Sequence, residues 1–557
     1  MKTRTISVLL SALFVLVSAN LLSNTAVPSS RTRAATNQAR NLLVYDVRTF
    51  GAKGDGKTLD STAINKAIDA AAAHGGGTVH FPAGNYLSVS IHLKSNIALY
   101  LDQGATIIAA ETSKSIQYDA PEPNAWDKYQ DFGHSHWHNS LIWGENLENI
   151  SIVGPGRIWG KGVVRTGAQS RTKEQNDAIK DVQVDKAVAP FDYPNPRDNV
   201  EVGWANKSIS LKLCRNVLIR DISILHGGHF AILATGVDNL TIDNLKIDTN
   251  RDGIDVDACR NVRISNCTVN SPFDDGICPK SSFALGYARA TENVTITNCQ
   301  VSGYDEGTLL DGTFKREYKK YNVSGPTGRI KFGTESNGGF KNITISNCVF
   351  DYCRGLALET VDGGLLEDVT ITNITMRDIA NAPIFLRLGS RLRGPSGGAV
   401  GALRRVIISN VVVYNASPKY ASIISGIPGH DIEDLKLANI RIYYEGGGTA
   451  QQAALDPPEK ENAYPEPAMF GEIPSYGFFI RHVRGIEMDD VAVSYSKEDV
   501  RPAYWLFDVK GVDLRHVKAS HSPNVSSFLL KDVEDFSLQQ SAPMLNRRIE
   551  RAKLERF

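Results

Sequence analysis

An alternating pattern of apolar and polar residues recurs along most of the chain. Each copy opens with Asn or a substitute for it, and Val, Ile and Thr dominate the positions that follow. Alternation with a period of two in β-branched residues predicts one β-strand per copy. The clearest copies begin at Asn216, Asn239, Asn261, Asn293 and Asn342, and weaker ones near Asp368, Arg405, Asp434, Gly485, Gly511 and Asp535.

The spacing of the copies predicts a solenoid. Asn239 follows Asn216 by 23 residues and Asn261 follows Asn239 by 22, while longer intervals mark insertions. One such coil cannot bury its inward side chains alone, whereas a stack of coils makes a continuous core. We therefore expect an all-β fold, a right-handed parallel β-helix, in which the repeated Asn side chains bond to one another as a ladder.

Both ends of this stack are expected to be covered. Thr62–Ala73 has the pattern of an amphipathic helix, with Asp60-Ser61 before it and Gly75-Gly76-Gly77 after it. A helix there would shield the open end of the coil stack from edge-to-edge pairing. The charged segment Leu545–Phe557 is expected to form a second helical cap, and the Pro- and Glu-rich segment Asp456–Pro474 a long surface loop.

The first residues have the layout of a secretory signal peptide. Lys2 and Arg4 precede an apolar run from Ile6 to Val17, which is shorter than the about 20 residues of a transmembrane helix. The alternative is an ordinary buried N-terminal helix. We expect secretion, to the extracellular or periplasmic space. The expected division is a signal peptide at 1–19, a flexible linker at 20–40, a single β-helix catalytic domain at 41–545, and a C-terminal tail or cap at 546–557.

Charge and cysteine content narrow the range of partners. The chain has 61 basic and 61 acidic residues, so we expect neither a nucleic-acid nor a membrane partner. Seven cysteines are too few for a disulfide scaffold. Cys267, Cys299 and Cys348 share the context Ser/Thr-Asn-Cys, which predicts a stacked structural position rather than a metal site. We expect a monomer without metal or cofactor.

Counting from the repeated Asn locates a column of titratable residues. The position 13 residues after Asn holds His229, Asp252, Asp274 and Glu306 in four successive copies. Equivalent positions in stacked coils lie roughly 4.8 Å apart, so these side chains are expected to form one row. Counted back from the following apolar residue, Asp275 instead of Asp274 matches Asp252. One extra residue predicts a β-bulge that turns both Asp274 and Asp275 outward.

Stacked carboxylates predict acid–base chemistry. Because they repel one another, the pKa of at least one should be raised enough to hold a proton at neutral pH. A protonated acid beside ionised bases suits glycosidic hydrolysis, and a carboxyl separation of ~6.5–9.5 Å would leave room for the water of an inverting mechanism. The alternative is a set of solvated aspartates, such as Asp255 and Asp257, that carry no chemistry.

Two motifs in the sequence resemble those of a known enzyme family. Asn250-Arg251-Asp252 and Asp274-Asp275 resemble the Asn-Thr-Asp and Asp-Asp motifs of the polygalacturonases, glycoside hydrolase family 28. The segments Phe50–Gly56 and Gly76–Val79 resemble the same family and its pectin-lyase-like relatives, and the likeness covers most of residues 45–520. It implies a secreted inverting hydrolase that cleaves galacturonosyl-type linkages in pectic polysaccharide. It also implies that Asp274 is the general acid and that Asp252 and Asp275 activate the water.

The chain departs from the family's pattern at two points. Where the family has Gly-His-Gly, the chain reads Gly303-Tyr304-Asp305-Glu306, so His229, Tyr304 and Glu306 are candidate substitutes. Where the family has Arg-Ile-Lys, the chain has Ala357-Leu358-Glu359. Arg329-Ile330-Lys331 spells that motif about one coil early, which we interpret as a coincidence. Glu359 would repel an acidic sugar, which favours a rhamnogalacturonan or another decorated pectic glycan.

Further candidate substrate-binding residues are basic. Arg387 could bind a sugar carboxylate, or it could belong to a solvated basic turn. Lys280 and Arg481 are further candidate substrate-binding residues. In Gly133–His138, a strand would place His134, His136 and His138 on one face, as a sugar subsite, a packed ladder or a metal site.

Two other functions remain open at this stage. A lyase on the same fold would use calcium held by the same aspartates, and a glycan-binding solenoid would need no catalytic residue. If the protein is a hydrolase, the insertions after Asn293 and Asp434 could close one end of the substrate-binding groove. This predicts that the enzyme attacks the polysaccharide from its chain ends.

Overall fold

The computed structural model describes residues 44–130, 133–164, 203–317 and 325–557. The expected signal peptide and linker, residues 1–40, lie outside the described residues. Leu43–Phe557 forms one compact unit. No helix among the described residues is long and apolar enough to cross a membrane.

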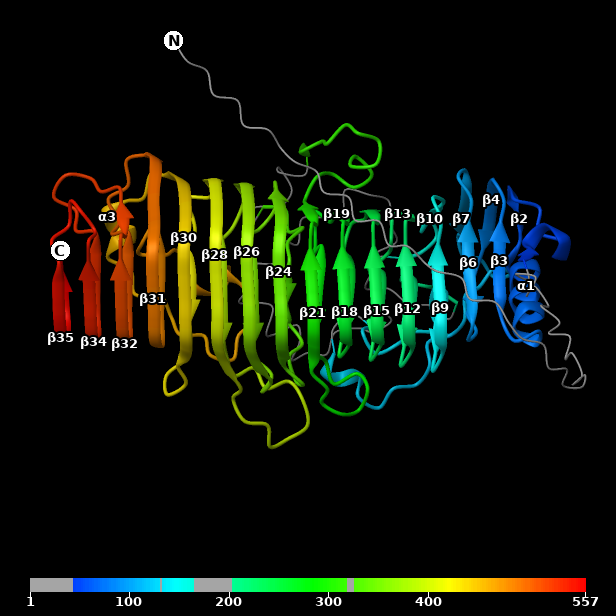
Figure 1. Ribbon diagram of the computed structural model, residues 1–557, viewed down its shortest axis with the longest axis horizontal. Helices are drawn as coiled ribbons and strands as arrows, with labels where there is room; N and C mark the ends of the chain where they lie inside the picture. Colours follow the sequence, from blue (N-terminus) through cyan, green and yellow to red (C-terminus); the bar gives the residue numbers. More distant parts are fainter. Residues whose placement is uncertain (1–43, 131–132, 165–202, 318–324) are drawn as a thin grey trace, which may run out of the picture. The chain divides into compact units, whose positions relative to one another are not determined.

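The repeated alternating segments are strands that stack in parallel. In successive coils Val217 pairs with Leu240, Leu240 with Val262, Val262 with Val294, and Val294 with Ile343. Figure 1 shows these strands side by side in chain order. The strands of this face are β6 (Ile97–Leu101), β9 (Glu148–Val153), β12 (Arg215–Arg220), β15 (Asp238–Asp243), β18 (Arg260–Ser265), β21 (Thr291–Thr297) and β24 (Phe340–Asp351).

Short strands continue each coil on a second face. They pair with their neighbours in the same parallel order. These strands are β4 (Gly84–Ser88), β7 (Ala105–Ala109), β10 (Arg157–Trp159), β13 (Ser223–Leu225), β16 (Lys246–Asp248), β19 (Thr268–Asn270) and β22 (Gln300–Ser302).

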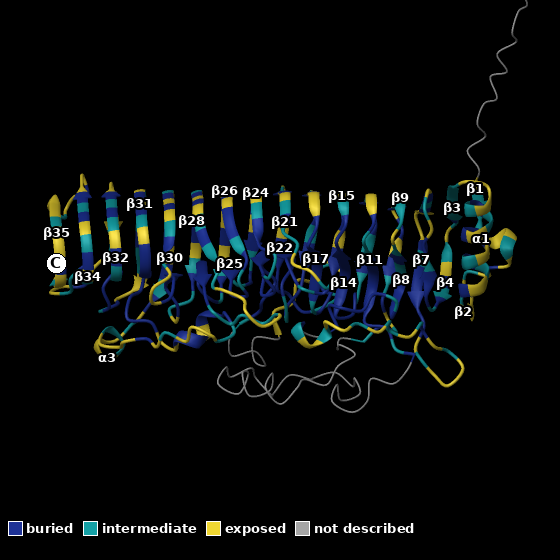
Figure 2. Ribbon diagram, turned by 90° about the horizontal axis from the view of Figure 1, so that it is seen from below, coloured by how far each residue is buried: buried dark blue, intermediate teal, exposed yellow. Residues whose placement is uncertain are grey.

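Later coils merge these two faces into long strands. Buried apolar residues alternate with more exposed residues along these strands, and Figure 2 shows this alternation of burial by colour. The exposed residues include the apolar Ile407 and Val412 as well as polar side chains. These strands are β26 (Leu365–Ile379), β28 (Ala402–Ala416), β30 (Ile432–Gly446), β31 (Phe478–Lys497), β32 (Tyr504–Arg515) and β34 (Phe528–Gln539). The short strand β33 (Lys518–Ala519) pairs with the end of β31.

A third face carries the candidate site. It begins as a six-stranded parallel sheet with the strand order β20-β17-β14-β11-β8-β5. A bridge between Ile277 and Ile330 continues it into four later strands. Its members are β5 (Ile91–His92), β8 (Ser140–Glu145), β11 (Lys207–Lys212), β14 (Phe230–Thr235), β17 (Asp252–Asp257), β20 (Ile277–Lys280), β23 (Lys331–Phe332), β25 (Leu356–Thr360), β27 (Ile384–Leu388) and β29 (Ser422–Ser425).

The predicted Asn ladder is present. Asn239 donates its side-chain amide to Asn216 Oδ1 at 3.0 Å and accepts one from Asn261 at 3.2 Å. Asn293 and Asn342 extend the series. These residues have φ values of 54° to 57°, the left-handed region that Asn tolerates better than most residues. The repeat therefore selects Asn both for its backbone conformation and for its amide.

The cysteine prediction is also confirmed. Cys267, Cys299 and Cys348 are buried at equivalent points of successive coils, where the backbone N–H of Gln300 bonds to Cys267 O and that of Val349 to Cys299 O. All seven cysteines are buried and free.

The two ends of the solenoid are closed differently. The predicted helix is α1 (Ser61–Ala73), which buries Ile64, Ala67, Ile68 and Ala71 beside β1 (Val44–Asp46), β2 (Asp55–Leu59) and β3 (Gly77–Phe81). The helical cap expected over Leu545–Phe557 is wrong. That segment forms β35 (Arg547–Arg556), which pairs antiparallel with β34. A strand satisfies the open backbone groups of the last coil, which a helix laid across the end would leave unpaired.

Candidate active site

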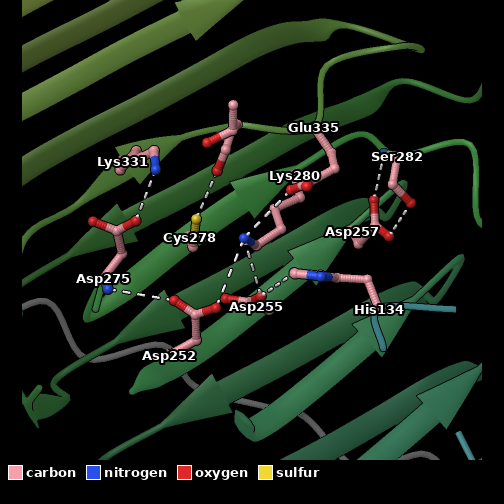
Figure 3. Close-up of polar contacts among 12 residues, drawn as sticks. His134, Asp252, Asp255, Asp257, Asp275, Cys278, Lys280, Ser282, Lys331 and Glu335 are labelled. Atoms are coloured by element: carbon pink, nitrogen blue, oxygen red, sulfur yellow. Dashed lines mark hydrogen bonds and ion pairs between the residues drawn. The ribbon is translucent and has the colours of Figure 1, made fainter. Parts of the chain in front are cut away.

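Three aspartates meet where β17 and β20 begin. Asp252 is the first residue of β17, and Asp274 and Asp275 lie in the turn before β20. One carboxylate oxygen from each lies within 4.8 Å of the others. The backbone N–H of Asp275 also points to Asp252 Oδ1 at 3.3 Å (Figure 3). The aspartate motifs therefore converge as the sequence predicted. The expected carboxyl separation of ~6.5–9.5 Å is wrong, because the stacked coils and the turn before β20 bring these oxygens closer together.

The predicted β-bulge is absent from this pair of strands. Ile254 pairs with Ile277, and the register continues without a shift to Asp257 and Lys280. The extra residue lies in the turn ahead of β20, where there is no ladder to disturb. Asp275 therefore takes the place beside Asp252, while Asp274 projects from the turn.

Two cations hold Asp275. Arg329 Nε lies 2.8 Å from Asp275 Oδ1, and Lys331 Nζ lies 3.1 Å from Asp275 Oδ2. Burial alone would raise the pKa of Asp275, but Lys331, Arg329 and Lys280 together lower it well below its usual range. Asp275 is thus an ionised carboxylate with both oxygens engaged.

Asp252 has the opposite electrostatic environment. Burial raises its pKa well above the usual range, and the charges of Asp255 and Asp274 add to this, while Lys280 opposes it. The pKa values of the neighbouring Asp252 and Asp275 are therefore driven apart, which is how acid and base roles are separated at one site. The direction of this pKa shift is the one expected for a carboxylate stacked beside others.

A buried charge network continues behind Asp252. Lys280 Nζ lies 3.8 Å from Asp252, 3.5 Å from Asp255 and 3.6 Å from Glu335 (Figure 3). His134 Nε2 lies 3.6 Å from Asp255. Asp255 and Asp257 are buried, and Asp257 accepts hydrogen bonds from the backbone and hydroxyl of Ser282. The alternative of solvated aspartates is therefore wrong at these two positions.

Asp274 is the accessible member of the three. Its side chain is 23% exposed, against 3% for Asp252 and 2% for Asp275. Asp274 Oδ2 pairs with Arg251 Nη2 at 2.5 Å, and the Arg251 side chain is 27% exposed. Among the three carboxyls, Asp274 is the one that a bound molecule reaches first.

A distant loop closes one side of this cluster. In the segment between β30 and β31, Glu466 pairs with Arg329, and Tyr464 OH accepts hydrogen bonds from Lys331 at 3.4 Å and Thr334 at 2.9 Å. The loop also packs apolar side chains on the outer face of the sheet. The buried residues of this second apolar cluster are Ala357, Ala382, Phe385, Tyr420, Ala421, Ile423, Met469, Phe470, Ile473, Phe479, Trp505 and Leu529.

Two sequence families match the chain. The family described as rhamnogalacturonase A/epimerase, pectate lyase-like, matches residues 44–195. The family described as right handed beta helix region matches residues 197–322. The second match confirms the predicted handedness of the parallel β-helix.

Known proteins add to these matches. The exo-poly-alpha-D-galacturonosidase of Dickeya chrysanthemi is 28% identical over 378 residues, which cover 62% of this chain and 57% of that protein. A probable polygalacturonase of Vitis vinifera is 23% identical over 416 residues, covering 71% of this chain and 73% of the relative. The family 28 exopolygalacturonase of Yersinia enterocolitica has the same fold, with a TM-score of 0.56 at 19% identity over 88% of this chain and 78% of that one. The chain is similar in sequence to polygalacturonases and shares the β-helix fold of the exopolygalacturonase.

Arg329 and Lys331 of the segment Arg329-Ile330-Lys331 lie at the aspartate cluster. The interpretation of this motif as a coincidence is wrong, because Arg329 and Lys331 both contact Asp275. Thr327, Gly328 and Arg329 stack on the turn that carries Asp274 and Asp275, so Ile330 stands directly beside Ile277. A fixed count from Asn293 therefore reaches Glu306 inside the insertion.

The predicted row of four side chains is wrong at its two ends. Phe230 pairs with Asp252, which places His229 one residue out of register. His229 is buried, with its ring 6.4 Å from that of His134. Glu306 pairs with His226 at 3.0 Å, outside the ladder of the sheet. Tyr304, the third candidate substitute, donates its hydroxyl to Asp351 of β24.

The three histidines of Gly133–His138 do not share one face, since this segment is a turn and not a strand. His134 points to Asp255, whereas His136 contacts Asp127 at 3.1 Å and His138 contacts Glu145 at 2.9 Å. Of these three histidines, only His134 joins the charge network behind the aspartates.

Glu359 lies behind Lys331, at 3.9 Å from its Nζ, and is fully buried. Burial raises the pKa of Glu359 to about 8, against the pull of Lys331 and Arg329. A neutral carboxyl in this position does not repel an acidic sugar, so the expected electrostatic conflict is relieved.

Arg387 and Arg481 hold the loop instead of reaching the aspartates. Arg387 donates to the backbone carbonyls of Glu459 and Lys460, and Arg481 donates to those of Pro457 and Pro458. The sequence offered no signal for Tyr464 and Glu466, which lie more than 100 residues from the side chains that they contact at the cluster.

Proposed function

We propose that this chain is a secreted glycoside hydrolase that cleaves galacturonosyl-type linkages in pectic polysaccharide. The observation that carries the proposal is the cluster of Asp252, Asp274 and Asp275, in which the pKa values of two neighbouring carboxyls are driven in opposite directions. The galacturonosidase and polygalacturonase relatives support the substrate class.

In the proposed reaction Asp274 donates a proton to the glycosidic oxygen of the leaving sugar. Its exposure and its place at the mouth of the cluster support this role. Asp252 and Asp275 position and activate the water that attacks the anomeric carbon. Asp275 is a poor covalent nucleophile because Arg329 and Lys331 occupy its oxygens, so direct attack by water with inversion is favoured.

We propose that attack starts from a chain end. The loop that carries Tyr464 and Glu466 lies against Lys331 and Arg329, and Arg387 and Arg481 anchor it. A polysaccharide that reaches Asp274 from the other side would meet this loop after a small number of sugars. This arrangement supports the groove closure that we expected from the insertion after Asp434.

The charges at the cluster argue against the calcium-dependent lyase. Lys331, Arg329 and Lys280 surround the carboxylates that a calcium ion would need, and Asp275 already has two cationic partners.

Digestion of polygalacturonate in EDTA tests the proposal. We expect saturated products, inverted anomeric configuration in proton NMR, and slow loss of viscosity relative to the release of reducing ends. Unsaturated products that require calcium would establish the lyase instead. Rapid early loss of viscosity would rule out attack from chain ends, and a retained anomeric configuration would rule out inversion.

A further inference from the structure

Arg251 forms an ion pair with the carboxyl that the proposed function uses as its acid. Arg251 precedes Asp252 in the chain and crosses to the neighbouring coil, where its Nη2 lies 2.5 Å from Asp274 Oδ2. The motif that this segment resembles has Thr at the position of Arg251. The pair is also the exposed edge of the cluster, with 27% and 23% of the two side chains accessible.

This pair conflicts with the role of Asp274 in the free protein. A general acid must hold a proton when it meets the leaving group, whereas a guanidinium partner stabilises the ionised form of a carboxyl. Burial and the charges of Asp255 and Asp274 raise the pKa of Asp252, so the buried Asp252 carboxyl favours its protonated form. Oxygens of Asp252 and Asp274 lie within 4.8 Å, a separation that one water molecule can bridge.

We propose that Arg251 is a specificity residue that a uronic acid carboxylate draws away from Asp274, so that the correct substrate completes the acid. When Arg251 binds the sugar carboxylate, Asp274 loses its cationic partner. One proton then leaves the Asp252 carboxyl and passes through a bridging water to Asp274. The cluster neither gains nor loses a proton, and Asp252 becomes the base beside the attacking water.

This inference rests on the proposed function, and it also predicts how the protein responds to methyl-esterified substrates. A sugar with a methyl-esterified carboxyl cannot form an ion pair with Arg251, so it leaves Asp274 paired. The wild-type protein should therefore discriminate between free and esterified oligogalacturonides in kcat as well as in KM.

The test compares the wild type with Arg251→Gln, Arg251→Lys and the control Arg263→Gln, whose side chain is exposed on β18. Each protein is assayed on oligogalacturonides and on their methyl esters. Loss of one charge-assisted contact of ~1.5–3 kcal/mol predicts that Arg251→Gln lowers the ratio of the two kcat values by about 10- to 100-fold. Its rate on the ester should stay constant or rise. Arg251→Lys should restore part of the ratio, and Arg263→Gln should leave it unchanged.

Equal loss on both substrates would overturn the inference, since it would mean that Arg251 only supports the fold. Binding of galacturonate and of its methyl ester, measured by calorimetry, separates this outcome from failure of the proposed function. The protein could instead prefer galacturonate through Arg251 and yet hydrolyse no galacturonide. That result would overturn the proposed hydrolase and the proton transfer together, and Arg251 would be a carboxylate-binding residue only. Equal affinity of Arg251→Gln and wild type for galacturonate would overturn the inference alone.

Discussion

Lys331 Nζ lies 3.1 Å from Asp275 Oδ2, although 56 residues separate the two in the chain. The insertion in the sequence between β22 and β23 is followed by a strand that stacks on β20. Together with Arg329, Lys331 stabilises an ionised carboxylate in a buried position. This relationship is the electrostatic reason why the pKa of Asp275 is lowered while that of Asp252 is raised.

Replacing Arg329 should destabilise the protein strongly. Arg329→Met leaves Asp275 and Glu466 with one cationic partner fewer inside the protein, and breaking a buried pair costs about 3–5 kcal/mol. Urea denaturation measures this loss. The matched control Arg215→Met removes an exposed partner of Glu148 and should change the free energy of unfolding by about 1 kcal/mol or less. Similar losses in the two variants would contradict the buried network.

Glu359 should make stability depend on pH. Its pKa is about 8 in the folded protein and 4.5 as the ordinary value, so unfolding releases a proton between these pH values. The wild type should therefore lose stability as pH rises from 4.5 to 8, by an amount on the order of a few kcal/mol. Glu359→Gln should lack this component. Parallel stability curves for the two proteins would show that Glu359 is ionised in the folded state.

His482 should stabilise the loop at low pH. It lies 2.8 Å from Asp508 and 3.2 Å from Glu459, and these carboxylates raise its pKa although burial lowers it. The contribution of the charged ring is present below the ordinary pKa of 6.5 and is lost as pH rises through the raised value. Limited proteolysis of the segment 456–475 should therefore quicken above that pH in the wild type. His482→Gln should be cut quickly at every pH, whereas the exposed control His516→Gln should behave as wild type.

Replacing an Asn of the ladder by Gly should destabilise the protein less than replacing it by Ala, although both substitutions lose the same hydrogen bonds. Asn239→Ala loses two amide bonds and places Ala at a φ of 56°, for an expected cost of about 2–3 kcal/mol. Asn239→Gly loses the same bonds without the Cβ conflict and should cost about 1 kcal/mol less. Equal unfolding free energies for the two variants would mean that the left-handed conformation does not select the residue.

The solenoid could be predicted because its signals are local and repeated. The alternation that begins at Asn216 fixes strands, inward faces and the ladder at once, and the helix before Gly75 has its own periodicity. The C-terminal strand β35 could not be predicted, because its charged sequence pairs with an edge strand that exists only once the rest of the fold has formed.

The site could be predicted only where the repeat continues without insertion. Asp252 and Asp274-Asp275 lie in coils of nearly equal length, so counting brings them together. The insertion at 303–329 breaks the count, which misplaced Glu306 and hid the role of Arg329 and Lys331. Tyr464 reaches the site through folding of a loop with no periodic pattern, so nothing in the sequence connects it with Lys331.

The most direct test of the account is hydrolysis of pectic polymers by the wild type, Asp274→Asn and Asp252→Asn. Asp513→Asn, a change at an exposed aspartate paired with Arg515, is the control. We expect saturated reducing ends from wild type and control, and rates at least about 100-fold lower from both site variants at unchanged thermal stability. Wild-type rates in a folded Asp274→Asn protein would contradict the catalytic role of the aspartate cluster.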